Sequence, residues 1–150
     1  MNKAVNKAAQ GGFTLIELIV VIVILGILAA TALPKFASLT GDARIASLQG
    51  AKGAVSSAST MLRGKYLIKS ESPMTIEGNS ITMVNGYPNA AGIIIVAGVG
   101  DDFNAQAIGN TTYIRPKNLP DGMNDSCMLT YKEATATVAP EIKLVTSKCE

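Results

Sequence analysis

Residue types that carry out chemistry are scarce in this sequence. The chain of 150 residues contains no histidine and only two cysteines, Cys127 and Cys149. Histidine is the commonest general base and a frequent zinc ligand. Histidine-based catalysis is therefore excluded, and few side chains are available as metal ligands. The sequence also lacks the glycine-rich loop of ATP-hydrolysing proteins. We therefore expect no enzymatic activity and no cofactor.

Oxygen ligands are present in acidic stretches of the second half of the chain. Asp101, Asp102, Asp121, Asn124 and Asp125 carry groups that calcium prefers. Their spacing matches no EF-hand loop, and acidic residues are common in turns. We predict no metal site, and calcium binding in these loops remains the less favoured alternative.

Glu17 is the most unusual residue, because it lies in an apolar run. Residues 13–33 contain only two other polar side chains, Thr14 and Thr31. A helix of this length spans about 31 Å, which matches the hydrocarbon core of a membrane. A charge at the centre of a membrane helix costs about 2.5–3.5 kcal/mol and usually has a partner. Glu17 is therefore a candidate functional residue, although a polar residue near the membrane edge is also tolerated.

The order of segments predicts a single-pass membrane protein. Lys3 and Lys7 precede the apolar run, which places the N-terminal side in the cytoplasm and the remainder outside. An ordinary secretory signal is removed together with its apolar region. Cleavage after Gly12 would instead retain that region. We divide the chain into a leader (1–12), a transmembrane and assembly half of a helix (13–33) and a globular domain (34–150).

The net charge and the two cysteines further limit the class of protein. The formal net charge is only +2 and the basic residues are scattered, so no nucleic-acid partner is expected. Cys127 and Cys149 bracket 21 residues in a part of the chain predicted to be exported. This favours one disulfide enclosing residues 127–149 over two free core thiols.

The predicted fold class is α+β, with one long N-terminal helix packed on a C-terminal antiparallel sheet. The helix is expected from about Thr14 to about Leu62, with a bend at Pro34. Beyond the proline its pattern becomes amphipathic, and this second half should cover the sheet. The apolar stripe comprises Leu48, Ala51, Val55, Ala58 and Leu62, and the small residues Gly41, Gly50 and Gly53 should allow close approach by other backbone.

Strand signals follow the helix. Residues 74–77 and 80–84 flank a turn at Gly78-Asn79, and residues 85–88 are turn-like. Residues 90–99 fit a strand or a short helix, and the Asn89 cap favours the helix. Residues 127–133 and 141–148 are predicted to form an antiparallel pair, with both cysteines at the same end.

The N-terminal motif resembles a known family. Gly12-Phe13-Thr14-Leu15-Ile16-Glu17 is similar to the class III signal of type IV pilins. The resemblance implies cleavage between Gly12 and Phe13 by a prepilin peptidase, and N-methylation of Phe13. It also implies that Glu17 pairs with the Phe13 amine of a neighbouring subunit. The segment from Gly26 to Pro34 is expected to lose helical structure in the assembled pilus.

Further stretches resemble the mannose-sensitive haemagglutinin (MSHA) branch of type IV pilins. They are residues 39–44, 50–54 and 86–88, together with the C-terminal cysteine pair. This implies a homopolymeric fimbrium that supports cell adhesion and biofilm formation. The subunit would lie in the inner membrane, contact the assembly machinery there, and then become extracellular. The alternatives are a type II secretion pseudopilin and a minor tip pilin with an adhesive ectodomain.

Overall fold

The computed structural model describes residues 12–149, without the side chains of residues 35–38. The chain divides after Ser38 into two compact units, and each is described by itself. The helix α1, Leu15–Lys69, begins in the first unit and ends in the second. The bend expected at Pro34 stays a prediction, because the relative placement of the two units is not determined.

The described part of the first unit is mainly helical. Residues 15–38 of α1 are helical throughout, including Gly26 and Pro34. Leucine favours helix, and a segment in a membrane forms a helix even when it is rich in isoleucine and valine, because its backbone polar groups must be satisfied internally. Such a segment also tolerates the two helix-weakening residues. Among the described residues, α1 is the one helix that is long and apolar enough to cross a membrane.

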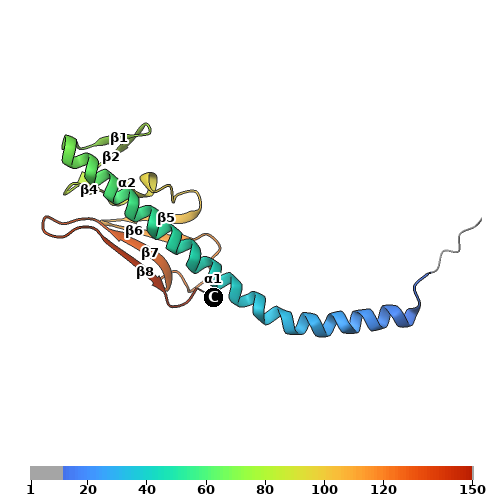
Figure 1. The fold of residues 1–150 in the computed structure, drawn as a ribbon. Coiled ribbons are helices and arrows are strands. Elements are labelled where there is room, and N and C mark those ends of the chain that lie inside the picture. The colour runs from blue at the N-terminus through green and yellow to red at the C-terminus, as the bar shows by residue number, and fades with distance from the viewer. Residues whose placement is uncertain (1–11, 150) are drawn as a thin grey trace, which may run out of the picture. The chain divides into compact units, whose positions relative to one another are not determined.

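The second unit contains a four-stranded antiparallel sheet. Its strands occur in sequence order: β5 (Phe103–Ile108), β6 (Thr111–Pro116), β7 (Cys127–Lys132) and β8 (Glu141–Thr146). The part of α1 after residue 39 runs across one face of this sheet (Figure 1). This arrangement confirms the predicted α+β class with a long helix packed on an antiparallel sheet.

The core forms between α1 and the sheet. The apolar residues of the predicted helical stripe are all buried, because they recur every three or four positions and so share one helix face. On the sheet side, Ile114, Leu129 and Tyr131 are fully buried in the same cluster. A second cluster joins Leu62 to residues of two small hairpins.

These hairpins and a short helix connect α1 to the sheet. β1 (Met74–Ile76) pairs with β2 (Asn79–Ile81), and β3 (Met83–Val84) pairs with β4 (Tyr87–Pro88). The helix α2, Ala90–Val96, follows directly. The Asn89 side chain accepts a hydrogen bond from the Gly92 N–H at 2.8 Å, which confirms the predicted cap and the preference for a helix.

Buried polar contacts attach the start of α2 to the sheet. The Tyr131 hydroxyl donates to the Pro88 carbonyl at 2.7 Å, and the Thr112 hydroxyl donates to the Ala90 carbonyl at 2.6 Å. The Glu133 carboxylate accepts from the Ala90 N–H at 2.7 Å. The two hydroxyl contacts are buried and the Glu133 contact is partly buried. The buried contacts satisfy atoms that would otherwise be left unpaired.

Two predicted boundaries were wrong. The helix α1 continues past Leu62 to Lys69, because Leu62 and Tyr66 still pack on the second cluster. It ends where Ser70 adopts a left-handed conformation (φ 52°) and donates to the Tyr66 carbonyl. The first hairpin turns at Glu77-Gly78 rather than Gly78-Asn79, with positive φ at both turn residues.

Of the three helix glycines expected to allow close approach, Gly41 is buried, but Gly50 and Gly53 contact no other part of this chain. A Cβ atom added at Gly50 or Gly53 would meet no other atom within 4 Å. Both lie on the exposed side of α1. No described part of the chain uses the space that these glycines leave open.

Candidate assembly site

The predicted cleavage position lies on exposed residues just before α1. Gly12 and Phe13 precede α1, and the Phe13 side chain is 94% exposed. The leader before Gly12, including Lys3 and Lys7, lies outside the described residues. The backbone on the carboxyl side of Gly12 is thus not buried within this unit.

Glu17 closes a capping box with Thr14. Its carboxylate oxygen Oε2 accepts hydrogen bonds from the Thr14 N–H at 2.9 Å and from the Thr14 hydroxyl at 2.8 Å. In return the Thr14 hydroxyl accepts from the Glu17 N–H at 3.2 Å. Reciprocal bonding of this kind satisfies N–H donors in the first helical turn, which have no intrahelical partner. The Thr-x-x-Glu spacing would have indicated this role from the sequence, but that reading was missed.

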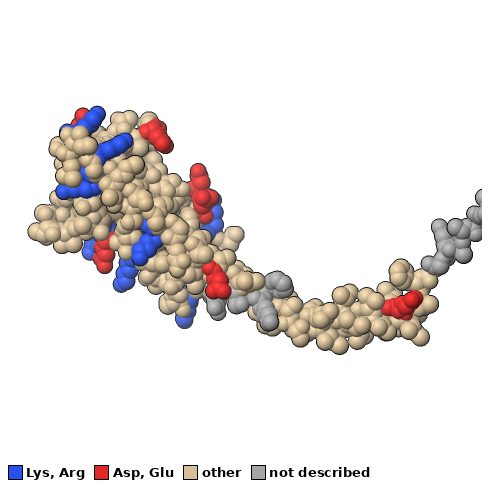
Figure 2. Space-filling model, in the orientation of Figure 1, with Lys and Arg blue, Asp and Glu red and all other residues tan. Residues whose placement is uncertain are grey.

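The rest of this segment presents apolar side chains outward. Every leucine, isoleucine and valine from Leu15 to Leu33 is at least 47% exposed. Figure 2 shows the segment as uncharged apart from one acidic group. An apolar surface of this extent is stable only in lipid or against other protein.

Gly26 and Pro34, the expected points of helix flexibility, both lie inside the continuous helix. A Cβ atom at Gly26 would meet nothing within 4 Å, so this glycine is not required by packing inside the unit. Thr31 directs its hydroxyl to the Leu28 carbonyl at 2.9 Å and so satisfies its own polar group within the helix. Loss of helical structure on assembly stays a prediction.

The C-terminal cysteines are joined in the second unit. Cys127 and Cys149 form a disulfide with a Cα–Cα distance of 5.0 Å, and both residues are buried. Arg44 of α1 donates to the Cys149 carbonyl at 2.8 Å and to the Asn118 carbonyl at 3.0 Å. The helix thus holds both the disulfide and the loop before β7, a contact that no sequence motif indicated.

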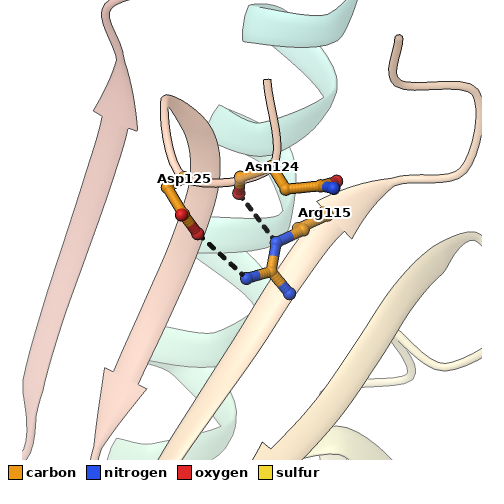
Figure 3. Close-up of polar contacts among 3 residues, drawn as sticks. All are labelled: Arg115, Asn124 and Asp125. Atoms are coloured by element: carbon orange, nitrogen blue, oxygen red, sulfur yellow. Dashed lines mark hydrogen bonds and ion pairs between the residues drawn. The ribbon is translucent and has the colours of Figure 1, made fainter. Parts of the chain in front are cut away.

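The acidic residues weighed as calcium ligands do not gather in the described structure. Within residues 12–149, no group of three or more acidic, histidine or cysteine side chains could hold a metal ion. Asp125 lies 3.5 Å from the Arg115 guanidinium, which also donates to the Asn124 carbonyl at 2.7 Å (Figure 3). Asn124 and Asp125, two of the residues considered as calcium ligands, therefore already interact with Arg115.

Comparison with known proteins gives a motif and several partial relatives. Residues 7–33 match the family described as "Prokaryotic N-terminal methylation motif". The chain is 40% identical over 67 residues to a fimbrial protein of Pseudomonas aeruginosa, covering 43% of this chain and 44% of that protein. It is 55% identical over 47 residues to the type IV narrow pilus major component PilA5 of Thermus thermophilus, covering 31% and 40%.

A secretion protein is among the relatives as well. The chain is 41% identical over 58 residues to the type II secretion system core protein G of Pseudomonas aeruginosa, covering 39% of this chain and 41% of that protein. The chain therefore spans less than half the length of the relatives that it matches. No solved structure matches it.

The methylation motif and the fold are similar to those of type IV pilins. The motif covers Gly12, Phe13 and Glu17, and the exposed apolar helix follows them in the chain. The long helix and antiparallel sheet supply the second feature of this class.

Proposed function

We propose that this protein is a structural subunit of a type IV pilus. After cleavage between Gly12 and Phe13, the subunit polymerises through its N-terminal helix, and N-methylation modifies the new Phe13 amine. The observation that supports this most directly is the exposed apolar surface of residues 15–33, interrupted by one carboxylate at Glu17. A soluble domain would bury such a surface, whereas a filament core can replace lipid by protein contacts.

Glu17 sets the register of assembly in this proposal. The Phe13 amine created by cleavage is a cation near the start of the helix, and in a bundle of helices the amine of one subunit can meet the carboxylate of the next. A subunit inserted out of register would leave a charge unpaired away from water, which is strongly unfavourable. The segment between Gly26 and Pro34 would extend as the helix adjusts to the filament.

Location and partners follow from the same sequence of events. The apolar helix anchors the unassembled subunit once in the inner membrane, with the second unit outside the cytoplasm. A prepilin peptidase acts on the leader, and inner-membrane assembly proteins move the subunit into the extracellular filament. Copies of the same chain are the main partners, and the role is structural rather than catalytic.

The finer assignment is an MSHA-like pilus that supports surface attachment and biofilm formation. It rests on the resemblance at residues 39–44, 50–54 and 86–88 and on the C-terminal cysteine pair. The similarity to a secretion core protein favours a second candidate, a type II secretion pseudopilin. A minor tip pilin with an adhesive ectodomain is the third candidate.

One experiment tests processing and role together. Filaments sheared from cells are purified, and their most abundant protein is sequenced from its N-terminus. We expect a methylated Phe13 as the first residue. An intact leader, or absence of the protein from the filaments, would contradict the proposal. Presence at trace level only would favour the tip role, and calcium-dependent stability of the subunit would favour the pseudopilin.

A further inference from the structure

Two arginines of the second unit lie over tyrosine rings at nearly the same distance. The guanidinium carbon of Arg115 is 5.2 Å from the centre of the Tyr113 ring. That of Arg63 is 5.0 Å from the centre of the Tyr87 ring. Stacking of this kind fixes the plane of the guanidinium and leaves its edges free to donate hydrogen bonds. The remaining partners of the two arginines differ.

Arg115 forms an ion pair with a carboxylate of its own chain. Its Nη2 atom lies 3.5 Å from Oδ1 of Asp125, and its Nε donates to the Asn124 carbonyl (Figure 3). Arg115 thus already has a carboxylate of its own chain as a counter-charge, although the Asp125 side chain is 91% exposed.

Arg63 has no such carboxylate. Its Nη1 atom donates to the Asn85 carbonyl at 3.2 Å. Within residues 12–149, no acidic side chain lies within 4.0 Å of its guanidinium. A guanidinium has five N–H donors in a planar fork that matches a carboxylate, so most of its donors remain available.

The turn between β3 and β4 fixes Arg63 in place. Gly86 has a φ of +82°, and a Cβ atom there would collide with the Arg63 guanidinium and with the Tyr66 ring. The backbone of this turn therefore lies directly against the guanidinium, which is half-buried. An arginine held on two sides loses less conformational entropy when it binds a ligand.

A cavity of about 310 Å³ adjoins this guanidinium. It is lined by Arg63, Asn85, Tyr87 and residues 135–139 of the β7–β8 loop. The Asn85 amide nitrogen donates to the Ala134 carbonyl at 2.9 Å, and an amide oxygen is an acceptor of hydrogen bonds. The hydroxyls of Tyr87 and Thr137 make no hydrogen bond to any described residue.

These groups match the chemistry of an acidic sugar. A carboxylate fits the arginine fork, and ring hydroxyls fit the Tyr87 and Thr137 hydroxyls and the Asn85 amide oxygen. The lining is mainly polar, which suits a hydroxyl-rich sugar, and Ala136, Val138 and Ala139 add a small apolar part that can contact the C–H groups of the ring. We propose that this cavity, the Arg63 cavity, binds one uronic acid unit of an acidic polysaccharide.

The Arg63 cavity lies wholly within the second unit, so its binding does not depend on the filament role proposed above. A weak site for one sugar would gain strength from repetition if many copies were displayed together. The binding itself is nevertheless a property of the single chain and can be measured on it.

The test uses the purified full-length chain in detergent micelles, titrated with a galacturonic acid trimer by isothermal calorimetry. The neutral maltotriose and acetate serve as comparison ligands. We expect the trimer to bind at least about tenfold more tightly than maltotriose, which lacks the carboxylate that pairs with the guanidinium. It should also bind at least about tenfold more tightly than acetate, which lacks the ring hydroxyls and the ring surface. Arg63→Gln should weaken binding by about tenfold or more, and Thr137→Val by a few-fold.

Arg115→Gln is the matched control, since it removes a guanidinium that also lies over a tyrosine ring but has a carboxylate of its own chain. It should leave trimer binding unchanged. Equal weakening by Arg115→Gln would indicate general charge attraction and overturn the proposal. So would equal binding of maltotriose or acetate, or no binding at all. If Arg63→Gln fails to fold, Thr137→Val on the exposed loop decides the matter alone.

Discussion

The carboxylate of Glu17 accepts two hydrogen bonds from Thr14, one from the backbone N–H at 2.9 Å and one from the hydroxyl at 2.8 Å. The chain thus provides a local partner for its one acid in the apolar segment before any neighbouring subunit is present. In a membrane, where water cannot satisfy polar groups, this lowers the free-energy cost of keeping the carboxylate in the helix. Assembly then adds a cation to a carboxylate that is already oriented.

Removal of the threonine hydroxyl should loosen the start of the helix. Thr14→Val keeps the shape but deletes the acceptor of the Glu17 N–H bond, at a cost of about 1 kcal/mol. We expect the Glu17 amide to exchange with deuterium about fivefold faster in detergent micelles. Thr14→Ser retains the hydroxyl and is the control. Equal exchange in Thr14→Val and the unmodified protein would rule out the capping role.

Replacement of the acid should separate membrane insertion from assembly. Glu17→Leu leaves the apolar helix intact, so the subunit should still be processed and stay in the membrane. It should yield few or no sheared filaments, because the neighbouring Phe13 amine loses its counter-charge. Thr31→Leu removes another polar side chain of the same segment and should assemble normally. Filaments at the usual level from Glu17→Leu would refute the register role.

The disulfide should contribute about 3 kcal/mol to the free energy of unfolding of the second unit, since it joins cysteines separated by 22 positions in the sequence. Unfolding of the full-length chain in urea, followed by circular dichroism, measures this. The double variant Cys127→Ser with Cys149→Ser should lose that amount, and the reduced unmodified protein should behave alike. A loss below 1 kcal/mol in both samples would contradict the estimate.

Tyr131 should make stability depend on alkaline pH. Burial raises the pKa of its hydroxyl to about 12, and the nearby Glu133 carboxylate acts in the same direction. A pKa raised by folding contributes stability that is complete below the unfolded value of about 10 and is lost as pH rises through 12. We expect a decline of about 2–3 kcal/mol over this window. Tyr131→Phe cannot ionise and should lack this part of the decline in urea unfolding at each pH.

The sequence predicted the elements whose signals are local or periodic. The buried helical stripe, the Asn89 cap and the β7–β8 pair were all anticipated, because side-chain periodicity and capping chemistry are properties of neighbouring residues. The first two strands of the sheet were missed. β5 contains two alanines, an asparagine and a glutamine, which favour strand weakly, and it is held mainly by pairing along β6.

Only the part of the candidate sites that is formed by neighbouring residues could be predicted from the sequence. Gly12, Phe13 and Glu17 stand in a contiguous motif and could be named from the sequence. The Arg44 contact joins positions 105 residues apart, and the Arg63 cavity combines α1, a hairpin turn and the β7–β8 loop. Such contacts depend on tertiary packing, which no local pattern encodes.

Gly50 and Gly53 lower the stability of α1, although the packing around them does not require glycine. A side chain at either position would meet open space, yet each glycine destabilises a helix by about 1 kcal/mol relative to alanine. The double alanine variant should therefore unfold at higher temperature as an isolated subunit. If its filaments remain intact, these two positions offer a way to engineer heat-tolerant fibres. If they do not, the two glycines mark where one subunit lies against the next.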